Sequence, residues 1–469
     1  MKIALKDKKV LVLGLGETGL SALRWLSSKG AILSVADSRD NPPNLADLML
    51  TMSAVKIYTG AFKEAVLLQF DIIVISPGVA LNQPAIQAAI AGNIPVIGDV
   101  ELFAQYRPEN AKVIAITGSN GKTTVTSLVG EMCKQAGLKT VVAGNIGLPV
   151  LDTLMADALI LNTPDIYVLE LSSFQLETTS SLLCDAATVL NICEDHLDRY
   201  DDMAAYATSK ARIFAHASVA VLNRDDATTF AMQSLNTVTF GLNSAPTVND
   251  FGLVENGCQW LASGQRKLLP SNALKITGQH NVANALAAVA LCSAIGIEKT
   301  AIIETLRNFK GLPHRVEWVA NINDVDYYDD SKGTNVGATC AAILGMTKHS
   351  ANHQGLQKVV LIAGGDGKGQ DFSPLAYAVQ TNARAVVLIG RDAHLIEAEL
   401  LATNVNLYRA IDLPEAVAIA QKLAQPNDAV LLSPACASFD MFKNYVHRAE
   451  VFIAAVNRLK SPAQQVAAC

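Results

Sequence analysis

Short apolar runs rich in β-branched residues recur along this chain, and helical patterns separate them. Runs of about four to eight such residues between helices are typical of strands buried in a parallel sheet. They lie in the segments KKVLVLGLG, AILSVAD, DIIVISPGV, KVIAITGSNGKTT, IYVLELSS, KVVLIAGGDGKG, ARAVVLIG and DAVLLSPACAS. The pattern predicts an α/β fold built on doubly wound parallel sheets.

Two interruptions of this pattern suggest domain boundaries. The chain has 469 residues, which at about 150 residues per domain predicts three domains. In GDVELFAQYRPENAKVIAITG a helix and a proline-containing loop lead to a new glycine-rich strand, and in NFKGLPHRVEWV glycine and proline end a helical pattern. We therefore expect domains over residues 1–100, 101–311 and 312–469.

Composition excludes several classes of protein. Half of the residues are apolar and 17% are charged, which argues against long disordered segments. The net charge of -6 lacks the basic surface of a general nucleic-acid binder. The longest uncharged stretch, residues 72–98, contains three prolines, whereas a membrane-spanning helix needs about 20 uninterrupted apolar residues. The N-terminus carries charges where a signal peptide is apolar, so we expect a cytoplasmic protein without membrane or nucleic-acid partners.

The eight cysteines are scattered and form no CxxC pair. A zinc site needs close pairs, and a disulfide framework is typical of short secreted chains. We expect reduced cysteines, and no second feature supports a nucleophilic role for Cys436 in SPACAS.

The first glycine-rich loop follows the first predicted strand. Gly14, Gly16 and Gly19 are spaced as in a dinucleotide-binding turn, and Asp37 ends the next strand, where a ribose-binding acid belongs. Glycines let the backbone approach a pyrophosphate, and a nucleotide sugar diphosphate offers that group as well as NAD does. A tight turn without a ligand is a third interpretation. The segment SPGV, residues 76–79, ends another strand and could line the same crevice.

The second glycine-rich loop, in AITGSNGKTTVTSLV, carries the strongest motif. Backbone N–H groups of such a loop cradle phosphates, Lys122 reaches the terminal phosphates and the Thr123 hydroxyl binds Mg²⁺. Ile116 stands where the standard pattern has glycine, so the loop is a variant. It predicts ATP binding.

Candidate metal ligands follow this loop. Glu170 ends a strand in ELSSFQLE, and NICEDHLDRY contains three acids around His196. Mg²⁺ prefers oxygen ligands, so from the residues alone His196 is as well explained by a hydrogen bond at a strand end. Lys210, on a helical face with Tyr206, would ordinarily be a solvated charge.

Together these segments resemble the Mur ligases, the ATP-dependent amino-acid ligases of peptidoglycan precursor synthesis. The matching elements are TGSNGKTT, ELSSFQLE, NxxEDHxDR, the YxxSKxRI helix, GQHNxxNxLAA, GLPHR, DDSKGTN and GGDGKG, in order along nearly the whole chain. The resemblance implies an N-terminal Rossmann-like UDP-binding domain, a central P-loop ATPase-like domain and a C-terminal Rossmann-like domain.

Within this family, the segment LSPACASFDMFKNY and the GLGxTG start are similar to the members that add D-glutamate to UDP-N-acetylmuramoyl-L-alanine. The Asn-Pro-Arg motif typical of the members that add a diamino acid is missing. The resemblance implies an ADP-forming ligase that works through an acyl phosphate and acts as a monomer.

The resemblance also implies roles for individual residues. Expected to be catalytic are Lys122, His196, Lys210 and Lys332. Expected to bind ATP are Gly118, Ser119, Asn120, Gly121, Lys122, Thr123, Thr124, Asn281, Arg315 and Asp330. Two Mg²⁺ ions would be held by Thr123, Glu170, His196 and a carbamylated Lys210. Expected to bind the UDP-substrate are Gly16, Thr18, Asp37, Ser38, Arg39, Gly78, Asn145 and His196. Expected to bind D-glutamate are Thr334, Lys368, Ser438 and the backbone near Tyr445.

Three alternatives stay open at this point. The chain could be another Mur ligase or a folylpolyglutamate-type ligase. It could be an NAD(P)-dependent oxidoreductase that uses the loop with Gly14, Gly16 and Gly19. It could also be a non-catalytic P-loop switch.

Overall fold

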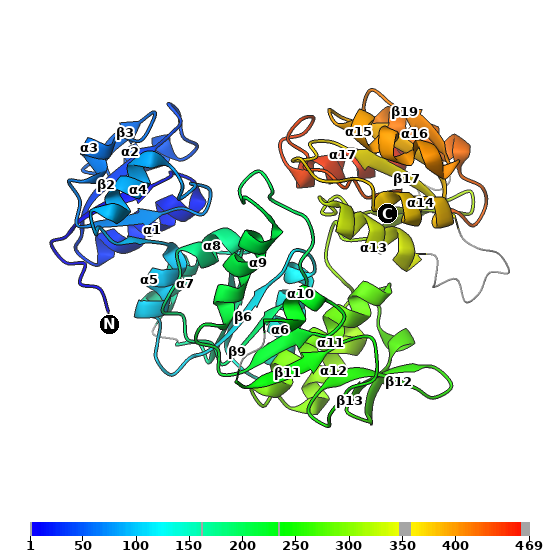
Figure 1. Ribbon diagram of the computed structural model, residues 1–469, viewed down its shortest axis with the longest axis horizontal. Coiled ribbons are helices and arrows are strands. Elements are labelled where there is room, and N and C mark those ends of the chain that lie inside the picture. Colours follow the sequence, from blue (N-terminus) through cyan, green and yellow to red (C-terminus); the bar gives the residue numbers. More distant parts are fainter. Residues whose placement is uncertain (1, 161–162, 233–234, 347–357, 461–469) are drawn as a thin grey trace.

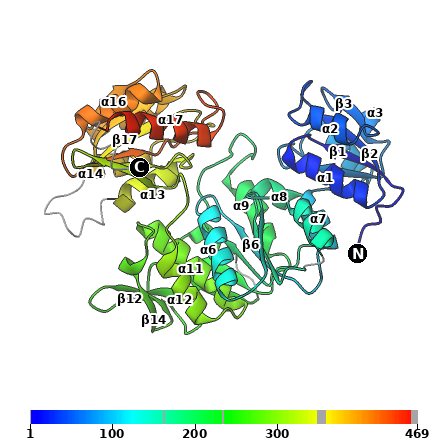
Figure 2. The same ribbon diagram turned by 180° about the vertical axis from the view of Figure 1, so that it is seen from behind.

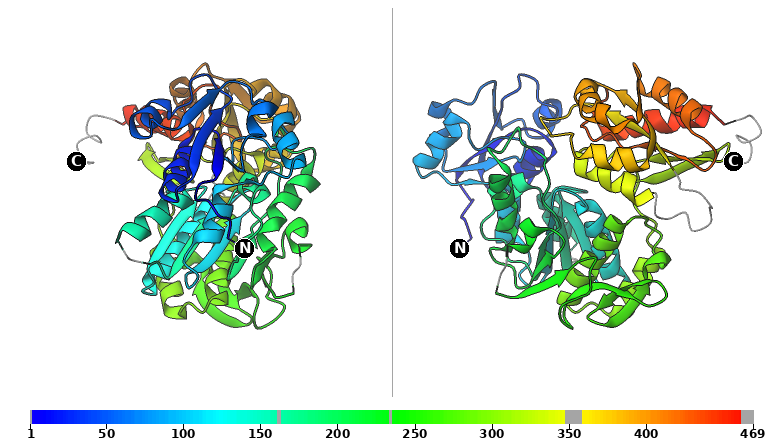
Figure 3. Two further views of the ribbon diagram at one scale, coloured as in Figure 1. Left: turned by 90° about the vertical axis from the view of Figure 1, so that its left-hand side faces the viewer. Right: turned by 45° about the vertical axis from the view of Figure 1, so that its right-hand side comes forward.

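The computed structural model describes residues 2–160, 163–232, 235–346 and 358–460, and it arranges them in three α/β units (Figure 1). All eight apolar runs form strands, and within each sheet these strands pair in parallel, which confirms the predicted fold class. The N-terminal and C-terminal units stand on opposite sides above the central unit (Figure 3).

The first sheet is parallel, and its strands lie in the order β3-β2-β1-β4-β5. Its strands are β1 (Lys9–Leu13), β2 (Ile32–Asp37), β3 (Lys56–Thr59), β4 (Ile72–Ile75) and β5 (Val96–Ile97). Its helices are α1 (Glu17–Ser28), α2 (Leu45–Thr51), α3 (Glu64–Leu67) and α4 (Pro84–Ala91). The strands β1, β2 and β3 follow one another toward one edge of the sheet, and β4 and β5 toward the other, so the strand order reverses between β1 and β4. Their C-terminal ends therefore open the crevice in which such sheets bind ligands.

The central sheet has the order β14-β13-β12-β11-β10-β9-β6-β8-β7. Its strands are β6 (Lys112–Thr117), β7 (Thr140–Gly144), β8 (Ile166–Glu170), β9 (Ala186–Val189), β10 (Ala220–Asn223), β11 (Thr237–Phe240), β12 (Phe251–Glu255), β13 (Gln259–Ser263) and β14 (Arg266–Pro270). Its helices are α5 (Asp99–Tyr106), α6 (Lys122–Gln135), α7 (Val150–Ile160), α8 (Ser173–Glu177), α9 (Met203–Ala211), α10 (Ala227–Phe230), α11 (Gln279–Ala294) and α12 (Lys299–Asn308). Figure 2 shows α6 and α11 together on one face, and Figure 1 shows α8 and α9 on the other.

The third sheet has the order β15-β16-β20-β17-β18-β19 and is parallel except between β15 and β16. Its strands are β15 (Glu317–Ile322), β16 (Val325–Asp329), β17 (Val359–Gly364), β18 (Ala383–Ile389), β19 (Asn406–Arg409) and β20 (Ala429–Leu432). Its helices are α13 (Val336–Met346), α14 (Leu375–Asn382), α15 (Ala393–Leu400), α16 (Leu413–Leu423) and α17 (Tyr445–Arg458). The switch point lies between β17 and β20, so the loops after these strands face the same crevice.

The first and central units share one apolar core. It runs from Val10 and Trp25 in the first unit to Val113 and Tyr167 in the central unit. Phe103 of the connecting helix α5 packs edge-on against Tyr167, with ring centroids 4.9 Å apart. The third unit has its own cores on the two faces of its sheet. It meets the central unit through polar contacts around the site described below.

Two sequence expectations bear on the chemistry of the fold. The described cysteines are free thiols, and burial raises the pKa of Cys436 to about 12, which does not fit a nucleophile. Cys469 lies outside the described residues. Among the helices within the described ranges, none combines the length and the apolar character that crossing a bilayer would require.

Candidate active site

A phosphate-binding loop, residues 118–121, follows β6, and α6 begins directly after it at Lys122. Gly118 and Gly121 have φ angles of 152° and 82°, which L side chains rarely adopt. A Cβ on Gly121 would also overlap the side-chain oxygen of Asn284 in α11. Only glycine lets the loop pass this close to α11, and the first N–H groups of α6 remain available to a phosphate.

The segment after β9 fixes this loop. Asn191 accepts from the Ser119 and Asn120 amides at 2.9 and 2.8 Å, through its backbone and side-chain oxygens. The Ser119 hydroxyl donates to the Cys193 carbonyl and accepts from the Cys193 amide, both at 3.0 Å. Asn191 and Cys193 were not predicted as site residues, because NICEDHLDRY draws attention to its acids and histidine.

Two lysines, the partly buried Lys122 and the buried Lys210, lie against the phosphate-binding loop. Lys122 Nζ donates to the carbonyls of Gly118 and Ser119 at 2.8 and 2.9 Å. Lys210, 2% exposed in α9, donates to the Gly118 carbonyl at 3.1 Å. Burial, followed by the charge of Lys122, holds the pKa of Lys210 well below its ordinary value. From the residue pattern alone Lys210 would be a solvated surface charge, and its buried position contradicts that interpretation.

Glu170, at the end of β8, carries an unpaired oxygen. Its Oε1 accepts from Asn145 Nδ2 at 2.8 Å, while its buried Oε2 has no hydrogen-bond partner among the described residues. Such an atom is unfavourable unless something else binds it. Thr123 and His196 line the same cavity. This set of oxygen ligands with one imidazole is compatible with Mg²⁺. It contains no sulfur ligand that would favour a softer metal.

His196 is held as a neutral imidazole. Its backbone is left-handed, with φ 59°, and its ring packs edge-on against Phe174 with centroids 4.9 Å apart. Burial lowers the pKa of His196 to about 4; nearby lysines act in the same direction, and Asp195 opposes them. The ring is therefore uncharged near pH 7 and able to donate a lone pair to a metal.

The third unit reaches the phosphate-binding loop through cationic side chains. Arg315 Nη2 donates to the Thr123 hydroxyl at 2.6 Å. Lys368 Nζ lies 2.9 Å from Asp195 Oδ1, in a largely buried ion pair. These contacts bring the start of β15 and the loop after β17 to the end of the central sheet.

Two further residues of the third unit lie at this junction. Asn335 donates to Asn120 Oδ1 at 3.0 Å, and its role was not predicted from the sequence. Lys332 Nζ lies 4.2 Å from the centroid of the Tyr445 ring. Burial, reinforced by the charge of Arg315, lowers the pKa of Lys332 to about 8. Lys332 is still mostly protonated at pH 7.

His314 anchors the segment just before β15, which carries Arg315. His314 Nδ1 is hydrogen-bonded to Asp329 Oδ2 at 2.7 Å, and its amide donates to Glu317 Oε2 at 2.8 Å. Within the described part of the chain, these three form the one cluster of at least three histidine, cysteine or acidic ligands close enough to share a metal. Because the buried Asp329 also accepts from Ser331, we interpret the cluster as a hydrogen-bonded support for Arg315.

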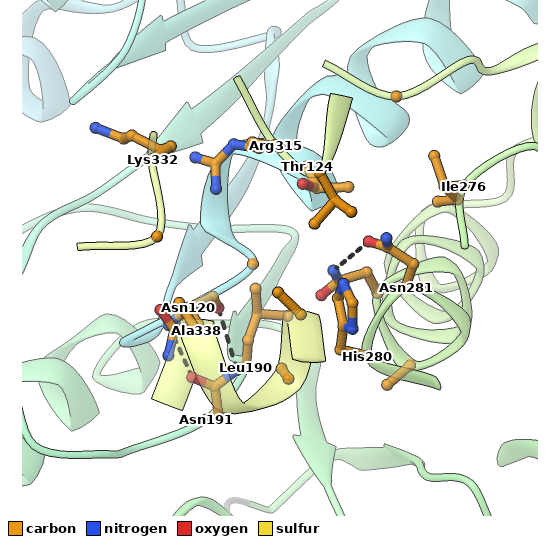
Figure 4. Close-up of a pocket in the computed structure, with 18 of the residues that line it drawn as sticks. Asn120, Thr124, Leu190, Asn191, Ile276, His280, Asn281, Arg315, Lys332 and Ala338 are labelled. Carbon is orange, nitrogen blue, oxygen red and sulfur yellow. Dashed lines mark hydrogen bonds between the residues drawn. The ribbon is translucent and has the colours of Figure 1, made fainter. Parts of the chain in front are cut away.

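A cavity of about 300 Å³ lies between the phosphate-binding loop, α11 and the third unit (Figure 4). Asn281 and His280 enter it from α11, and Arg315 and Lys332 lie on the opposite side. Asp330 also lines it, and burial raises the pKa of this carboxyl to about 7. The cavity combines polar groups at the phosphate-binding loop and α11 with apolar side chains such as Phe240, Leu242 and Ile276, as a purine nucleotide requires.

A second cavity, of about 780 Å³, opens between the ends of the first sheet and the central sheet. A Cβ on Gly19 would overlap the Gly14 carbonyl, so Gly19 lets α1 pack on β1. A Cβ on Gly16 would meet nothing within 4 Å. Packing therefore does not require glycine at position 16, and the space beside Gly16 at the start of α1 is open.

Asp37 closes one side of this second cavity. Its carboxylate accepts from the Leu15 amide at 2.7 Å and from the Arg39 guanidinium at 2.8 and 2.7 Å. Burial alone would raise the pKa of Asp37, but the hydrogen bonds from Arg39 and Leu15 outweigh it and lower the pKa to about 2. The carboxylate is thus ionised and already paired.

A third cavity, of about 270 Å³, joins the other two. It shares Asn145 with the second cavity, and Arg315 and Lys332 with the nucleotide cavity. Its walls carry an excess of positive charge: the cations Lys122, Arg315, Lys332 and Lys368 face the carboxylates Glu170 and Asp195. The positive potential in this cavity favours the binding of several anionic groups close together.

The predicted site residues divide among these cavities. The nucleotide cavity is lined by Asn120, Gly121, Thr124, Asn281, Arg315, Asp330 and Lys332. The second cavity is lined by Gly16, Thr18, Asp37, Ser38, Arg39, Gly78 and Asn145. The joining cavity is lined by Ser119, Asn120, Gly121, Lys122, Thr123, Asn145, Glu170, His196, Lys210, Arg315, Lys332, Thr334 and Lys368. His196, assigned from the resemblance to substrate and metal, lines only the joining cavity.

Three predicted residues line none of these cavities. Gly118 contributes its carbonyl to the two lysines instead. Ser438 is 3% exposed in the loop after β20, and Tyr445 is the first residue of α17. Both lie on the third unit, and the Lys332 ammonium faces the Tyr445 ring.

Comparisons with known proteins agree with this arrangement. Residues 8–98 match the family described as Mur ligase MurD-like, N-terminal domain. Residues 116–292 match the Mur ligase middle domain, and residues 314–436 match the Mur ligase, glutamate ligase domain.

Similar proteins are found over the full length. The chain is 59% identical to the UDP-N-acetylmuramoylalanine–D-glutamate ligase of Methylobacillus flagellatus, over 98% of each chain. It is 55% identical to the protein of the same name from Thiobacillus denitrificans, over 99% of each. Among solved structures, UDP-N-acetylmuramate-alanine ligase MurC from Thermotoga maritima aligns over 97% of this chain and 100% of its own, with a TM-score of 0.60. At 20% identity, that last likeness concerns the fold alone.

Proposed function

This chain belongs to the Mur ligase family, and from that membership we propose that it joins D-glutamate to UDP-N-acetylmuramoyl-L-alanine with consumption of ATP. It is an ADP-forming ligase of peptidoglycan precursor synthesis. The observation that carries this assignment is the 59% identity to a D-glutamate ligase across 98% of both chains. We further propose that it acts as a monomer in the cytoplasm, with domains over residues 1–100, 101–311 and 312–469.

ATP would occupy the nucleotide cavity with its phosphates on residues 118–124. Asn281 would face the adenine, and Asp330 and Arg315 would complete the site from the third unit. Lys122 now donates to two loop carbonyls, and the incoming phosphate oxygens would replace them. The nucleotide cavity and the joining cavity share lining residues, among them Arg315 and Lys332. This supports a placement of ATP in which the γ-phosphate projects into the joining cavity.

Thr123, Glu170 and His196 would hold two Mg²⁺ ions, which supply charge neutralisation for phosphoryl transfer when bound. The buried, unpaired Oε2 of Glu170 and the neutral ring of His196 support this assignment. Lys210 would be carbamylated, because addition of CO₂ requires a neutral amine and its lowered pKa provides one. The resulting carbamate would add a negative charge beside the ammonium group of Lys122.

The UDP-substrate would lie in the second cavity, with its pyrophosphate at the start of α1 near Gly16 and Thr18. Asn145, which lines both this cavity and the joining one, would mark the point where the L-alanine carboxylate enters the reaction centre. The full pairing of Asp37 with Arg39 and Leu15 suits a fixed wall for the uridine end.

D-Glutamate would approach from the third unit. Lys368 and Thr334 would bind its α-carboxylate, and Ser438 with the backbone at Tyr445 would bind its side-chain carboxylate. Lys368 is now paired with Asp195, so the amino acid's carboxylate would compete with Asp195 for the ammonium group.

The reaction must overcome two unfavourable features. A carboxylate does not acylate an amine because oxide is a very poor leaving group. An oxygen of the L-alanine carboxylate therefore attacks the γ-phosphorus and releases ADP, which gives an acyl phosphate. The D-glutamate amine then attacks the acyl carbon, loses a proton and expels phosphate. Lys122, Lys332 and Arg315 would offset the repulsion between the carboxylate and the γ-phosphate. Contact between the units would keep water from the acyl phosphate.

Phosphate release from ATP in the presence of UDP-N-acetylmuramoyl-L-alanine tests this function when amino acids of both chiralities are compared. We expect release with D-glutamate and not with L-glutamate. Release dependent on another amino acid would reassign the chain within the family, and hydride transfer without ATP would support the oxidoreductase. Lys122→Ala should lower the rate on the order of a thousandfold. The matched control Lys134→Ala, on the exposed side of the same helix, should not.

A further inference from the structure

Arg199, at the end of the segment that follows β9, connects the central unit to the first unit. Its Nη2 donates to the carbonyl oxygens of Pro77 and Val79 at 3.3 and 3.0 Å. The side chain is 16% exposed and also lies 3.8 Å from Glu177 Oε2. A guanidinium presents several donors in one plane, so it can serve neighbouring carbonyls and a carboxylate at once.

The turn that Arg199 contacts belongs to the second cavity. Ser76, Pro77, Gly78 and Val79 all line it, directly after β4. The Ser76 hydroxyl donates to the Gly14 carbonyl at 3.1 Å. A Cβ on Gly14 would press on both Ser76 and Val79. The position of the turn therefore fixes the position of the glycine-rich loop at the switch point of the first sheet.

The other side of Arg199 faces the reaction centre. Its guanidinium carbon lies 4.4 Å from the centroid of the Phe174 ring, a cation–π contact. Phe174 in turn packs edge-on against the His196 ring. The Arg199 amide also donates to the His196 carbonyl at 2.9 Å. One residue thus contacts both the substrate-side turn and the support of His196.

We propose that Arg199 is a positioning residue that couples the turn at residues 76–79 to His196. This inference rests on the proposed function, because it assigns the UDP-substrate to the second cavity. When Arg199 holds the turn, the glycine-rich loop has the geometry that the substrate requires. Substrate that orders the turn also stabilises Arg199 against Phe174, and hence the orientation of His196. Coupling of this kind is reciprocal.

The test compares Arg199→Met with Arg199→Lys and a matched arginine. Arg212 is the control, because it donates to the carbonyls of Leu176 and Thr179 entirely within the central unit. For Arg199→Met we expect the KM for UDP-N-acetylmuramoyl-L-alanine and the Mg²⁺ concentration at half-maximal rate to rise about tenfold each. The KM for ATP should stay within about twofold. Arg199→Lys should recover part of the loss, since an ammonium group can still donate to one carbonyl.

A second measurement does not depend on turnover. The Val79 amide donates to the Ser76 carbonyl within the turn, so hydrogen exchange at this amide in the ligand-free protein reports how firmly the turn is held. We expect faster exchange in Arg199→Met than in wild type or Arg212→Met.

Unchanged exchange at Val79, or a KM for the UDP-substrate equal to that of wild type, would overturn the coupling role. An equal rise of every KM in Arg199→Met and Arg212→Met would also overturn it, since that result indicates a general structural effect. If wild type shows no D-glutamate-dependent release, the proposed function fails instead, and the exchange comparison still decides whether Arg199 holds the turn.

Discussion

The guanidinium of Arg315 donates a 2.6 Å hydrogen bond to the hydroxyl of Thr123, although the two residues belong to different units. We propose the same Thr123 hydroxyl as a Mg²⁺ ligand. The third unit is thus held at the phosphate-binding loop by an atom that the metal–nucleotide complex would also use. Binding of that complex and the placement of the third unit must therefore be linked.

Replacing Arg315 should separate these two effects. In Arg315→Met the KM for ATP and the KM for D-glutamate should both rise about tenfold or more, because the nucleotide loses a cation and the third unit loses an anchor. Steady-state kinetics with each substrate varied in turn measures this. Arg307→Met, an exposed arginine in α12, is the control. A rise confined to ATP would show that Arg315 does not place the third unit.

Lys210→Ala should abolish turnover, and a short-chain carboxylate should partly restore it. The added carboxylate would replace the anionic end of the carbamate that we propose. Lys210→Arg, which carries a positive charge and cannot react with CO₂ in this way, should not respond to carboxylate. Phosphate release with and without acetate measures the rescue. Near-normal activity of Lys210→Ala at low CO₂ would rule out the carbamate.

Acid should destabilise the protein through His280. Burial lowers the pKa of this ring from 6.5 to about 4, although its hydrogen bond to the backbone of Ala341 acts the other way. Between these pH values the unfolded chain binds a proton that the folded chain does not. The contribution is therefore complete above pH 6.5 and falls as the pH drops toward 4, by about 2 kcal/mol at pH 5.

Urea unfolding at pH 7 and pH 5 measures this loss as the difference between wild type and His280→Gln. The free energy of unfolding of the variant should depend less on pH over this interval, because glutamine does not titrate. Parallel curves for the two proteins would show that His280 does not bind a proton on unfolding.

Two alanine substitutions in the first glycine-rich loop should have opposite consequences. Gly19→Ala should destabilise the protein by about 2 kcal/mol or more, because its Cβ would overlap the Gly14 carbonyl. Gly16→Ala should fold with nearly unchanged stability, since its Cβ meets open space. It should nevertheless raise the KM for the UDP-substrate. Thermal unfolding together with kinetics distinguishes them, and equal destabilisation by both would contradict the assignment of Gly16 to ligand binding.

Lys368→Ala should raise the KM for D-glutamate far more than the KM for ATP. The ammonium group is the one that we propose for the α-carboxylate, and it is 2.9 Å from Asp195 in the absence of ligand. Asp195→Asn should weaken that competing pair. It controls for the loss of the ion pair alone. Equal effects of Lys368→Ala on both KM values would remove Lys368 from the amino-acid site.

Much of the fold could be predicted because its strands are short, apolar and β-branched. The runs that contain β4 and β17 are buried along their whole length, and they keep their pattern in any parallel sheet. Among the strands that the sequence analysis did not predict are β13, β14 and β15, which belong to antiparallel pairs at sheet edges. Their burial alternates or is partial, so they lack a continuous apolar run.

In the candidate site, too, the residues that belong to a local sequence pattern could be predicted and the others could not. Glycine-rich loops after strands are conspicuous in a sequence, and their residues do line the cavities. Asn191, Cys193 and Asn335 were missed because their role is to hold another segment of the chain, and no local pattern records such a contact. Arg199 was missed for the same reason: its partners lie about 120 residues earlier in the chain.

The central claim is that one joining cavity brings the L-alanine carboxylate, the γ-phosphate of ATP and the D-glutamate amine together. The most direct measurement uses UDP-N-acetylmuramoyl-L-alanine labelled with ¹⁸O in the L-alanine carboxylate. The account predicts that each phosphate released in the presence of ATP and D-glutamate carries one labelled oxygen from that carboxylate. Unlabelled phosphate would contradict it, because phosphate released by hydrolysis of ATP takes its new oxygen from water.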